Sequence, residues 1–108
     1  MSGLRVYLAG PMTGLPAFNY PAFNAEAARL RALGYQVENP AENPAPACGS
    51  WAMYMRASLR QLLTCDRVAL LPGWESSKGA QEEVRLSAVV GIAVVPCESL
   101  HVTLSLTS

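Results

Sequence analysis

The chain has 108 residues, 51% of them hydrophobic, which is enough for one compact domain with a core and too few for two. Its 8 basic and 8 acidic residues give a formal net charge of zero, which argues against electrostatic binding of DNA or RNA, because that needs a basic face. Little charge repulsion opposes self-association, so a homodimer or larger homo-oligomer is expected. We therefore expect a single domain over residues 1–108 that binds no nucleic acid.

The cysteines and apolar runs bear on compartment and cofactors. Cys48, Cys65 and Cys97 are an odd number without C-x-x-C spacing, so neither a disulfide framework nor a zinc site is indicated. The N-terminus shows no signal-peptide pattern, and the longest near-apolar run, residues 88–97, falls well short of the roughly 20 residues that span a bilayer. No histidine–carboxylate cluster suggests a metal. We expect a cytoplasmic protein with no membrane partner and no metal or other cofactor.

Apolar runs alternate with helical patterns along the first part of the chain. Residues 4–9 predict a buried strand that ends at Gly10-Pro11. After a loop, apolar residues at helical spacing follow Pro21 and predict a helix that Gly34 stops. Residues 35–39 predict the second strand.

The second half repeats this alternation. Ser50 is a good N-cap for a second helix, and we assign its residues Trp51, Met53 and Met55 to helix packing. Three strands and a helix follow, with the strands at residues 68–71, 92–95 and, half exposed at an edge, 102–106, and the helix from residue 79 or 80 to about 90. The alternation predicts an α/β fold with four to five mostly parallel strands and helices on both faces.

In such sheets ligands bind beyond the carboxyl ends of the strands. The loops expected there begin after residue 9, at Asn39 and at Pro72. Gly10-Pro11-Met12-Thr13-Gly14 in the first loop would let a ligand approach the backbone and offers a hydroxyl. It matches neither the Walker motif nor G-x-G-x-x-G, and an ordinary turn is the alternative.

The loop over residues 72–79 resembles a phosphate site. Ser76, Ser77 and Lys78 come directly before Gly79 and a helix, whose free N–H groups and positive dipole end suit a phosphate. The alternative is that a serine simply caps the helix. Trp74 would stack on a base or cover the edge of the core.

Two adjacent glutamates on the third helix differ in role because they lie about 100° apart. Glu82 is placed to pair with Arg85 in solvent. Glu83 shares the side of small residues that can lie against the sheet, where a carboxylate is costly to bury without purpose. We expect Glu83 to act as a nucleophile or an acid/base. Apolar residues on the Glu82 side suggest a subunit contact.

Several segments together resemble a known family. They are Val6-Tyr7-Leu8-Ala9-Gly10-Pro11-Met12-Thr13-Gly14, Val37-Glu38-Asn39-Pro40, Cys65-Asp66, Leu70-Leu71-Pro72-Gly73-Trp74 and Ser77-Lys78-Gly79-Ala80-Gln81-Glu82-Glu83. Over residues 4–95 the chain resembles the DUF4406 family, which is similar to nucleoside 2-deoxyribosyltransferases and nucleoside 5′-monophosphate N-glycosidases. The resemblance implies a flavodoxin-like three-layer sandwich and a nucleoside or nucleotide as the small-molecule partner.

The resemblance also implies roles for individual residues. Glu83 matches the glutamate that attacks C1′ of the sugar, and Tyr7 matches a tyrosine beside it. Ser77 matches a phosphate-binding serine of the monophosphate hydrolases, where the transferases carry an aspartate. The loop from Gly10 to Gly14 matches the one that wraps the sugar or phosphate. Partner chains commonly complete the site in these enzymes.

One position departs from both enzyme groups. Where they carry an aspartate that helps to protonate the leaving base, this chain has Ser58, and loss of general-acid help typically costs about 10²–10⁴-fold in rate. A structural dimerisation module would require the first and third loops to be plain turns. The sequence otherwise leaves two hypotheses, with Asn39 and Trp74 as further substrate-binding candidates in both. One is an N-glycosidase or deoxyribosyltransferase. The other is a catalytically silent binder of a nucleotide or nucleotide-derived signal.

Overall fold

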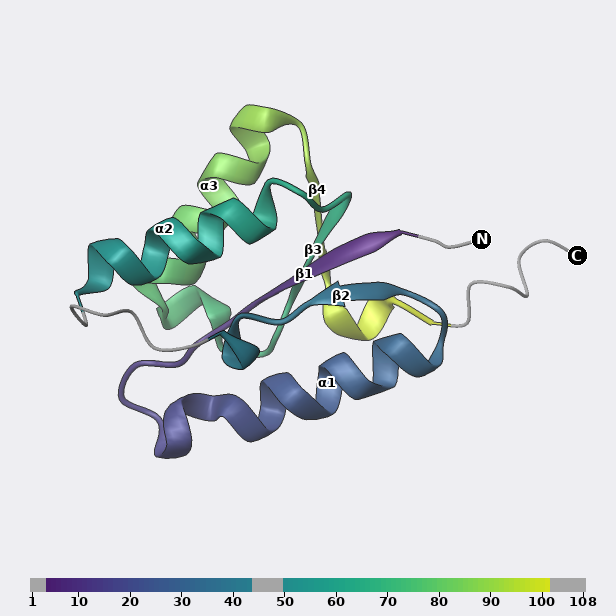
Figure 1. Cartoon of the computed structure of the whole chain (residues 1–108), viewed down its shortest axis with the longest axis horizontal. Coiled ribbons are helices and arrows are strands. Elements are labelled where there is room, and N and C mark those ends of the chain that lie inside the picture. Colours follow the sequence, from purple (N-terminus) through teal and green to yellow (C-terminus); the bar gives the residue numbers. More distant parts are fainter. Residues whose placement is uncertain (1–3, 44–49, 102–108) are drawn as a thin grey trace, which may run out of the picture.

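The computed structural model describes residues 4–43 and 50–101, in which four strands form one parallel sheet (Figure 1). The strands are β1 (Arg5–Ala9), β2 (Gln36–Glu38), β3 (Arg67–Leu70) and β4 (Ala93–Pro96), in the order β2-β1-β3-β4. The helices α1 (Tyr20–Ala32), α2 (Trp51–Leu62) and α3 (Lys78–Val90) alternate with them. This confirms the predicted α/β fold, and the order is that of flavodoxin-like sheets. The predicted edge strand at residues 102–106 lies outside the described residues.

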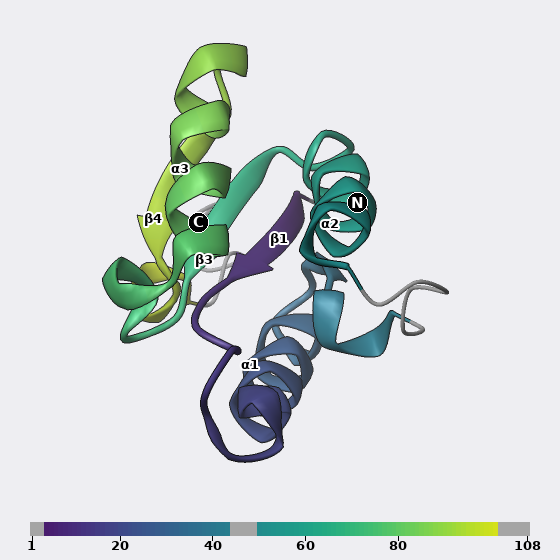
Figure 2. The same cartoon turned by 90° about the vertical axis from the view of Figure 1, so that its left-hand side faces the viewer.

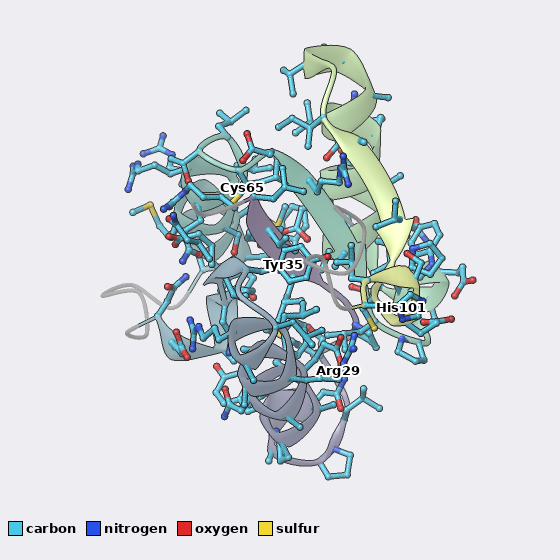
Figure 3. The ribbon with its side chains drawn as sticks, turned by 90° about the vertical axis from the view of Figure 1, so that its right-hand side faces the viewer. Arg29, Tyr35, Cys65 and His101 are labelled. Atoms are coloured by element: carbon cyan, nitrogen blue, oxygen red, sulfur yellow. The ribbon has the colours of Figure 1, made fainter. Side chains whose placement is uncertain are left out.

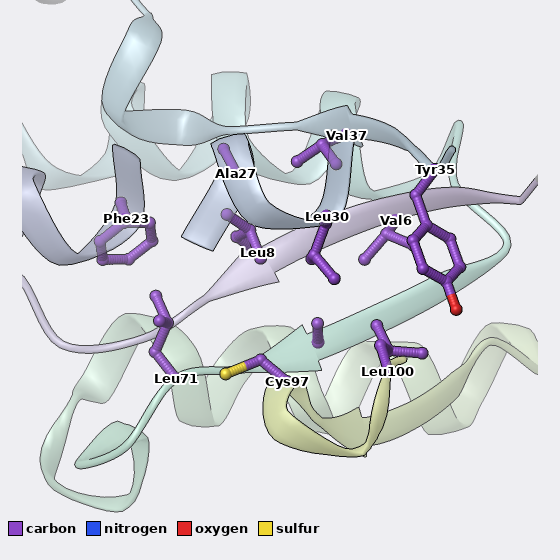
Figure 4. Close-up of a cluster of buried hydrophobic side chains, with 11 residues drawn as sticks. Val6, Leu8, Phe23, Ala27, Leu30, Tyr35, Val37, Leu71, Cys97 and Leu100 are labelled. Carbon is purple, nitrogen blue, oxygen red and sulfur yellow. The ribbon is translucent and has the colours of Figure 1, made fainter. Parts of the chain in front are cut away.

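Helices cover both faces of the sheet, so the fold has three layers. Helix α1 lies on one face, whereas α2 and α3 lie on the other (Figures 1 and 2). Side chains of β1 alternate between the faces, because successive residues of a strand point in opposite directions. Val6 and Leu8 belong to the core under α1, which Figure 4 shows. Tyr7 and Ala9 belong to the core under α2 and α3.

The end of the described chain is fastened to α1 and to Tyr35, the residue before β2. Arg29 of α1 donates hydrogen bonds to the carbonyl oxygens of Cys97 and Leu100, at 2.9 and 3.0 Å. The hydroxyl of Tyr35 donates to the carbonyl oxygen of His101 at 3.3 Å. Figure 3 shows Arg29, Tyr35 and His101. The segment after β4 thus closes the core on the α1 face.

The helices start close to the predicted residues, but the predicted packing of α2 is partly wrong. Ser50 caps α2 by accepting a hydrogen bond from the N–H of Met53 at 3.1 Å, as expected. The assignment of Trp51 and Met53 to packing is wrong, because both are exposed and only Met55 of that set is buried. The first turn of α2 extends beyond the sheet that buries its later residues, so Trp51 lines a cleft instead.

Candidate functional site

A two-lobed cleft lies at the carboxyl ends of β1 and β3. The strand order reverses between these strands, and ligands of such sheets bind at that switch point. The inner lobe, of about 510 Å³, reaches Tyr7 and Glu83. The outer lobe, of about 710 Å³, is lined by the loop after β3 and the start of α3. Both lobes are lined by Met12, Thr13, Trp51, Ser77 and Gly79, so they form one continuous cleft.

A buried carboxyl and a buried phenol meet in the inner lobe. The hydroxyl of Tyr7 donates a hydrogen bond to Oε2 of Glu83 at 2.6 Å. The Tyr7 side chain is 0% exposed and that of Glu83 is 5% exposed, yet both line the lobe. Residue 83 lies on the buried side of α3 with Ala80 and Ser87, as the helix periodicity predicts. The fold therefore aims this carboxyl at the centre of β1.

Burial changes the acidity of both groups. Loss of hydration raises the pKa of Glu83 to about 7, although the hydrogen bond from Tyr7 lowers it. The pKa of Tyr7 is raised well above its usual value, first by burial and then by the neighbouring Glu83 carboxylate. Tyr7 therefore stays protonated as a donor, whereas Glu83 changes charge near neutral pH. A carboxyl with such a pKa can serve as a nucleophile or a proton carrier.

Ser58 and Tyr54 of α2 lie beside this pair. Ser58 is 0% exposed, and its Oγ alone among buried side-chain polar atoms of the described residues lacks a hydrogen bond of good geometry. It is still close enough to Tyr7 and Tyr54 to lower the pKa of each phenol. Burial nevertheless raises the pKa of Tyr54 to about 12. Tyr54 lines the inner lobe, and its hydroxyl donates a hydrogen bond to Sδ of Met12, a weak acceptor, at 2.9 Å.

The first loop lines the cleft over most of its predicted length. Gly10, Pro11, Met12 and Thr13 line one lobe or both, whereas Gly14 is absent from the lining and takes a positive φ of 85°. A Cβ on Gly10 would come within 2.7 Å of the Leu71 side chain, so packing between the ends of β1 and β3 already requires this glycine. Asn19 donates to the carbonyl oxygen of Pro11 at 3.0 Å and steadies the loop.

The start of α3 carries the predicted serine. Ser77 caps the helix, because its Oγ accepts a hydrogen bond from the N–H of Ala80 at 3.2 Å. Its side chain also lines both lobes, as does Gly79. Lys78 is the chain's single lysine, lines the outer lobe, and holds its ammonium 4.7 Å from the ring centroid of Trp51. Capping thus explains Ser77, and binding of an anion there stays a prediction.

Two predicted binding residues do not reach the cleft in this structure. Asn39 is buried, where it donates to Oδ1 of Asn24 at 3.0 Å and accepts from the N–H of Ala41 at 3.0 Å. Trp74 is half-buried and packs against the core under α2 and α3. Neither lines either lobe. The alternative use of Trp74, to cover the edge of the core, fits its position better.

Sequence reasoning missed the aromatic lining of the inner lobe. Phe18, just before α1, and Tyr20, its first residue, line it together with Trp51 and Tyr54 of α2 and the predicted residues. The available signal was positional, because these aromatic residues sit in or next to segments at the carboxyl edge of the sheet. In the parts of the chain that the structure describes, no cluster of His, Cys, Asp and Glu could hold a metal, and no helix is long and apolar enough to cross a membrane.

Comparison with known proteins identifies the family. Residues 4–96 match the family described as "Domain of unknown function (DUF4406)". The chain belongs to this family. The matched segment of the DUF4406 domain contains all the residues that line the cleft among those described.

Other comparisons concern the fold. No curated protein matches the sequence significantly. Among solved structures, the domain is similar to the 2-deoxyribosyltransferase of the psychrotolerant bacterium Bacillus psychrosaccharolyticus. The TM-score is 0.67 and the identity 22%, and the match covers 84% of this chain and 70% of that one. The DUF4406 domain therefore has the flavodoxin-like fold of a deoxyribosyltransferase, as predicted.

Proposed function

We propose that the chain cleaves the N-glycosidic bond of a deoxyribonucleotide, as an N-glycosidase or a 2-deoxyribosyltransferase, with Glu83 as the nucleophile. The observation that carries this proposal is the Glu83 carboxyl, buried at the base of the cleft and hydrogen-bonded by Tyr7 at 2.6 Å. Its pKa of about 7 leaves about half of the molecules with an ionised nucleophile at neutral pH. The similarity to a deoxyribosyltransferase fold supports the same chemistry.

The chemistry runs in two steps. An oxygen of ionised Glu83 attacks C1′, the bond from C1′ to the base nitrogen breaks, and the base leaves with a proton. Water or a second base then attacks C1′ and releases the carboxylate. Tyr7, whose hydroxyl donates to Oε2, orients the carboxyl so that its other oxygen can attack. No cofactor is needed for either step.

The outer lobe supports a 5′-phosphate on the substrate. Ser77 and Gly79 line both lobes, so a sugar over Glu83 brings its 5′ end toward the start of α3. There the first N–H groups of the helix and the ammonium of Lys78 favour an anion. Among the described residues, Lys78 is the one cationic side chain that lines the cleft.

A second candidate is a catalytically silent binder of a nucleotide or nucleotide-derived signal. Ser58 favours it, because this hydroxyl stands where the related enzymes carry a proton-donating aspartate, and it cannot donate a proton strongly. The same cleft and the same ligand class serve both hypotheses. They differ in turnover alone.

Base release from a panel of deoxynucleosides and their 5′-monophosphates, followed by chromatography, tests the proposal. We expect release by the wild type and none by Glu83→Gln, while that variant still binds the substrate in a thermal-shift assay. Glu82→Gln is the matched control, because Glu82 is the adjacent residue and pairs with Arg85 on the helix surface at 2.7 Å. Binding without release would favour the silent binder. Equal release by wild type and Glu83→Gln would refute the mechanism.

We further propose a cytoplasmic, single-domain protein over residues 1–108 that assembles as a homodimer or larger homo-oligomer. The apolar side of α3 supports assembly, because Val89 is 70% exposed and Val90 48% exposed near its end. Light scattering coupled to size exclusion measures the oligomer number, and a monomer at micromolar concentration would contradict the expectation.

A further inference from the structure

The exposed aromatic residues of this protein are gathered in one place. Among the described residues, Phe18, Tyr20 and Trp51 are the exposed aromatic side chains, at 58%, 36% and 46%. All three line the inner lobe of the cleft. Single exposed apolar side chains are ordinary on a protein surface, but a group around one concave site marks a ligand or partner. The gathering is therefore evidence about what the lobe binds.

These side chains come from opposite sides of the sheet. Phe18 lies in the 3-10 turn Pro16–Asn19 that leads into α1, and Tyr20 begins α1. Trp51 begins α2, and these two helices cover opposite faces (Figures 1 and 2). The rings of Phe18 and Tyr20 form a tilted pair with centroids 5.8 Å apart. The starts of both helices flank the carboxyl end of β1, so the aromatic groups flank the lobe from two sides.

The backbone beneath Phe18 is unusual. Ala17, Phe18 and Asn19 all have left-handed φ values of 52°, 52° and 60°, a conformation that residues other than glycine rarely adopt. Such strain persists only where surrounding structure holds it, and it concentrates at ligand-binding sites. Here the side chain of Asn19 fastens the turn to Pro11. The turn holds Phe18 at the lobe instead of burying it.

Trp51, on the α2 side of the lobe, is held in place by Lys78. The ammonium of Lys78 lies 4.7 Å from its ring centroid, within cation–π range. Lys78 lines the outer lobe and Trp51 lines both lobes. This contact fixes the indole at the junction of the two lobes.

We propose that the inner lobe binds a nucleobase by stacking on Trp51, with Phe18 and Tyr20 closing the other side. The proposal rests on the proposed function, since it places the base of the substrate in the lobe that contains Glu83. A nucleobase is planar and aromatic, so its face can stack on the ring of such a side chain. Stacking of this kind accepts any of the bases, because every base has an aromatic face. A purine, with its larger face, should bind more tightly than a pyrimidine. The 5′-phosphate then extends into the outer lobe.

Tryptophan fluorescence provides the test, because the chain's two tryptophans differ in position. Trp74 does not line the cleft, so the double variant Glu83→Gln, Trp74→Phe reports on Trp51 without turnover. We titrate it with the four deoxynucleoside 5′-monophosphates and with 2-deoxyribose 5-phosphate, which has no base. Quenching by the nucleotides, strongest with purines and absent with the sugar phosphate, is expected. If the Trp74→Phe variant does not fold, the titration uses Glu83→Gln with both tryptophans present. The quenching seen there should be lost when Trp51→Leu is added.

Affinity measurements separate stacking from other contributions. Trp51→Leu and Phe18→Leu should each weaken nucleotide binding by about 5- to 150-fold and leave binding of 2-deoxyribose 5-phosphate unchanged. Leu63→Ala is the matched control, since Leu63 is also an exposed apolar residue of the α2 region, at 59%, but does not line the cleft. Unchanged nucleotide affinity in both variants, or no quenching by any nucleotide, would overturn the proposal. If base release depends on Glu83 but not on Trp51, the stacking proposal is refuted and the proposed enzyme activity stands. If nucleotides quench the fluorescence but no base is released, the enzyme activity is refuted and the stacking proposal stands.

Discussion

Ionisation of Glu83 should make the protein less stable as the pH rises. The pKa of this carboxyl is about 7 in the folded chain against 4.5 for an ordinary glutamate. The folded state thus holds a proton between these values that the unfolded state has lost, and stability falls across that window. The difference of about 2.5 pKa units corresponds to about 3 kcal/mol, fully present as stability below pH 4.5 and lost above pH 7. This is a large part of the 5–15 kcal/mol typical of a domain.

Glu83→Gln removes the titrating group and keeps an oxygen that can accept the hydrogen bond from Tyr7. We expect the free energy of unfolding of the wild type, relative to that of Glu83→Gln, to fall by about 3 kcal/mol between pH 4.5 and pH 8. Urea unfolding followed by circular dichroism at intervals of half a pH unit measures it. Glu82→Gln should follow the wild type, because the ion pair of Glu82 with Arg85 is at the surface. Parallel pH curves for wild type and Glu83→Gln would refute the assigned pKa.

Three further substitutions test the site. Tyr7→Phe removes a hydrogen bond to the Glu83 carboxylate, worth about 1.5–3 kcal/mol, so the acidic limb of the pH–rate profile should move up by about 1–2 units and the activity lost at pH 7 should recover at higher pH. Ser58→Asp should raise kcat by up to about 10²-fold if a buried acid is what the chain lacks; unchanged kcat would remove that explanation. Ser77→Asp should preserve the helix cap and the circular dichroism spectrum, yet raise the Michaelis constant for nucleotides above that for nucleosides, because the new carboxylate repels the phosphate.

The sequence was sufficient for the fold because each element carries a local signal. Short apolar runs marked the buried strands, Gly34 ended α1 with its positive φ of 104°, and Ser50 capped α2. Boundaries moved by a residue or two, as at Tyr20, where α1 begins one residue before the expected proline. The packing of Trp51 was misjudged because helical periodicity indicates which side of a helix is apolar but does not indicate where the sheet beneath it ends.

The site was predicted less completely, because it depends on how separate elements pack. Helix periodicity placed Glu83 toward the sheet, but a tyrosine inside an apolar strand resembles any core residue, and Tyr7 was singled out by family resemblance. Loop membership predicted Asn39 and Trp74 as binding residues. A loop has an inner and an outer side, however, and both side chains turn to the core or to neighbouring backbone. Phe18 reaches the cleft through left-handed backbone that composition does not reveal.

The chemistry of Glu83 bears on the choice between enzyme and silent binder. A glutamine at this position would still accept a hydrogen bond from Tyr7, although a weaker one than a carboxylate accepts, and would avoid the cost, about 3 kcal/mol, of ionising a buried carboxyl at neutral pH. For a protein that only binds nucleotides, a negative charge beneath the cleft is also unfavourable, because the ligand itself is an anion. The proposed glycosyl transfer, in contrast, needs an oxygen that can form and later release a bond to C1′, which a carboxylate supplies and an amide does not. The position, burial and partner of Glu83 therefore favour the proposed enzyme over the silent binder.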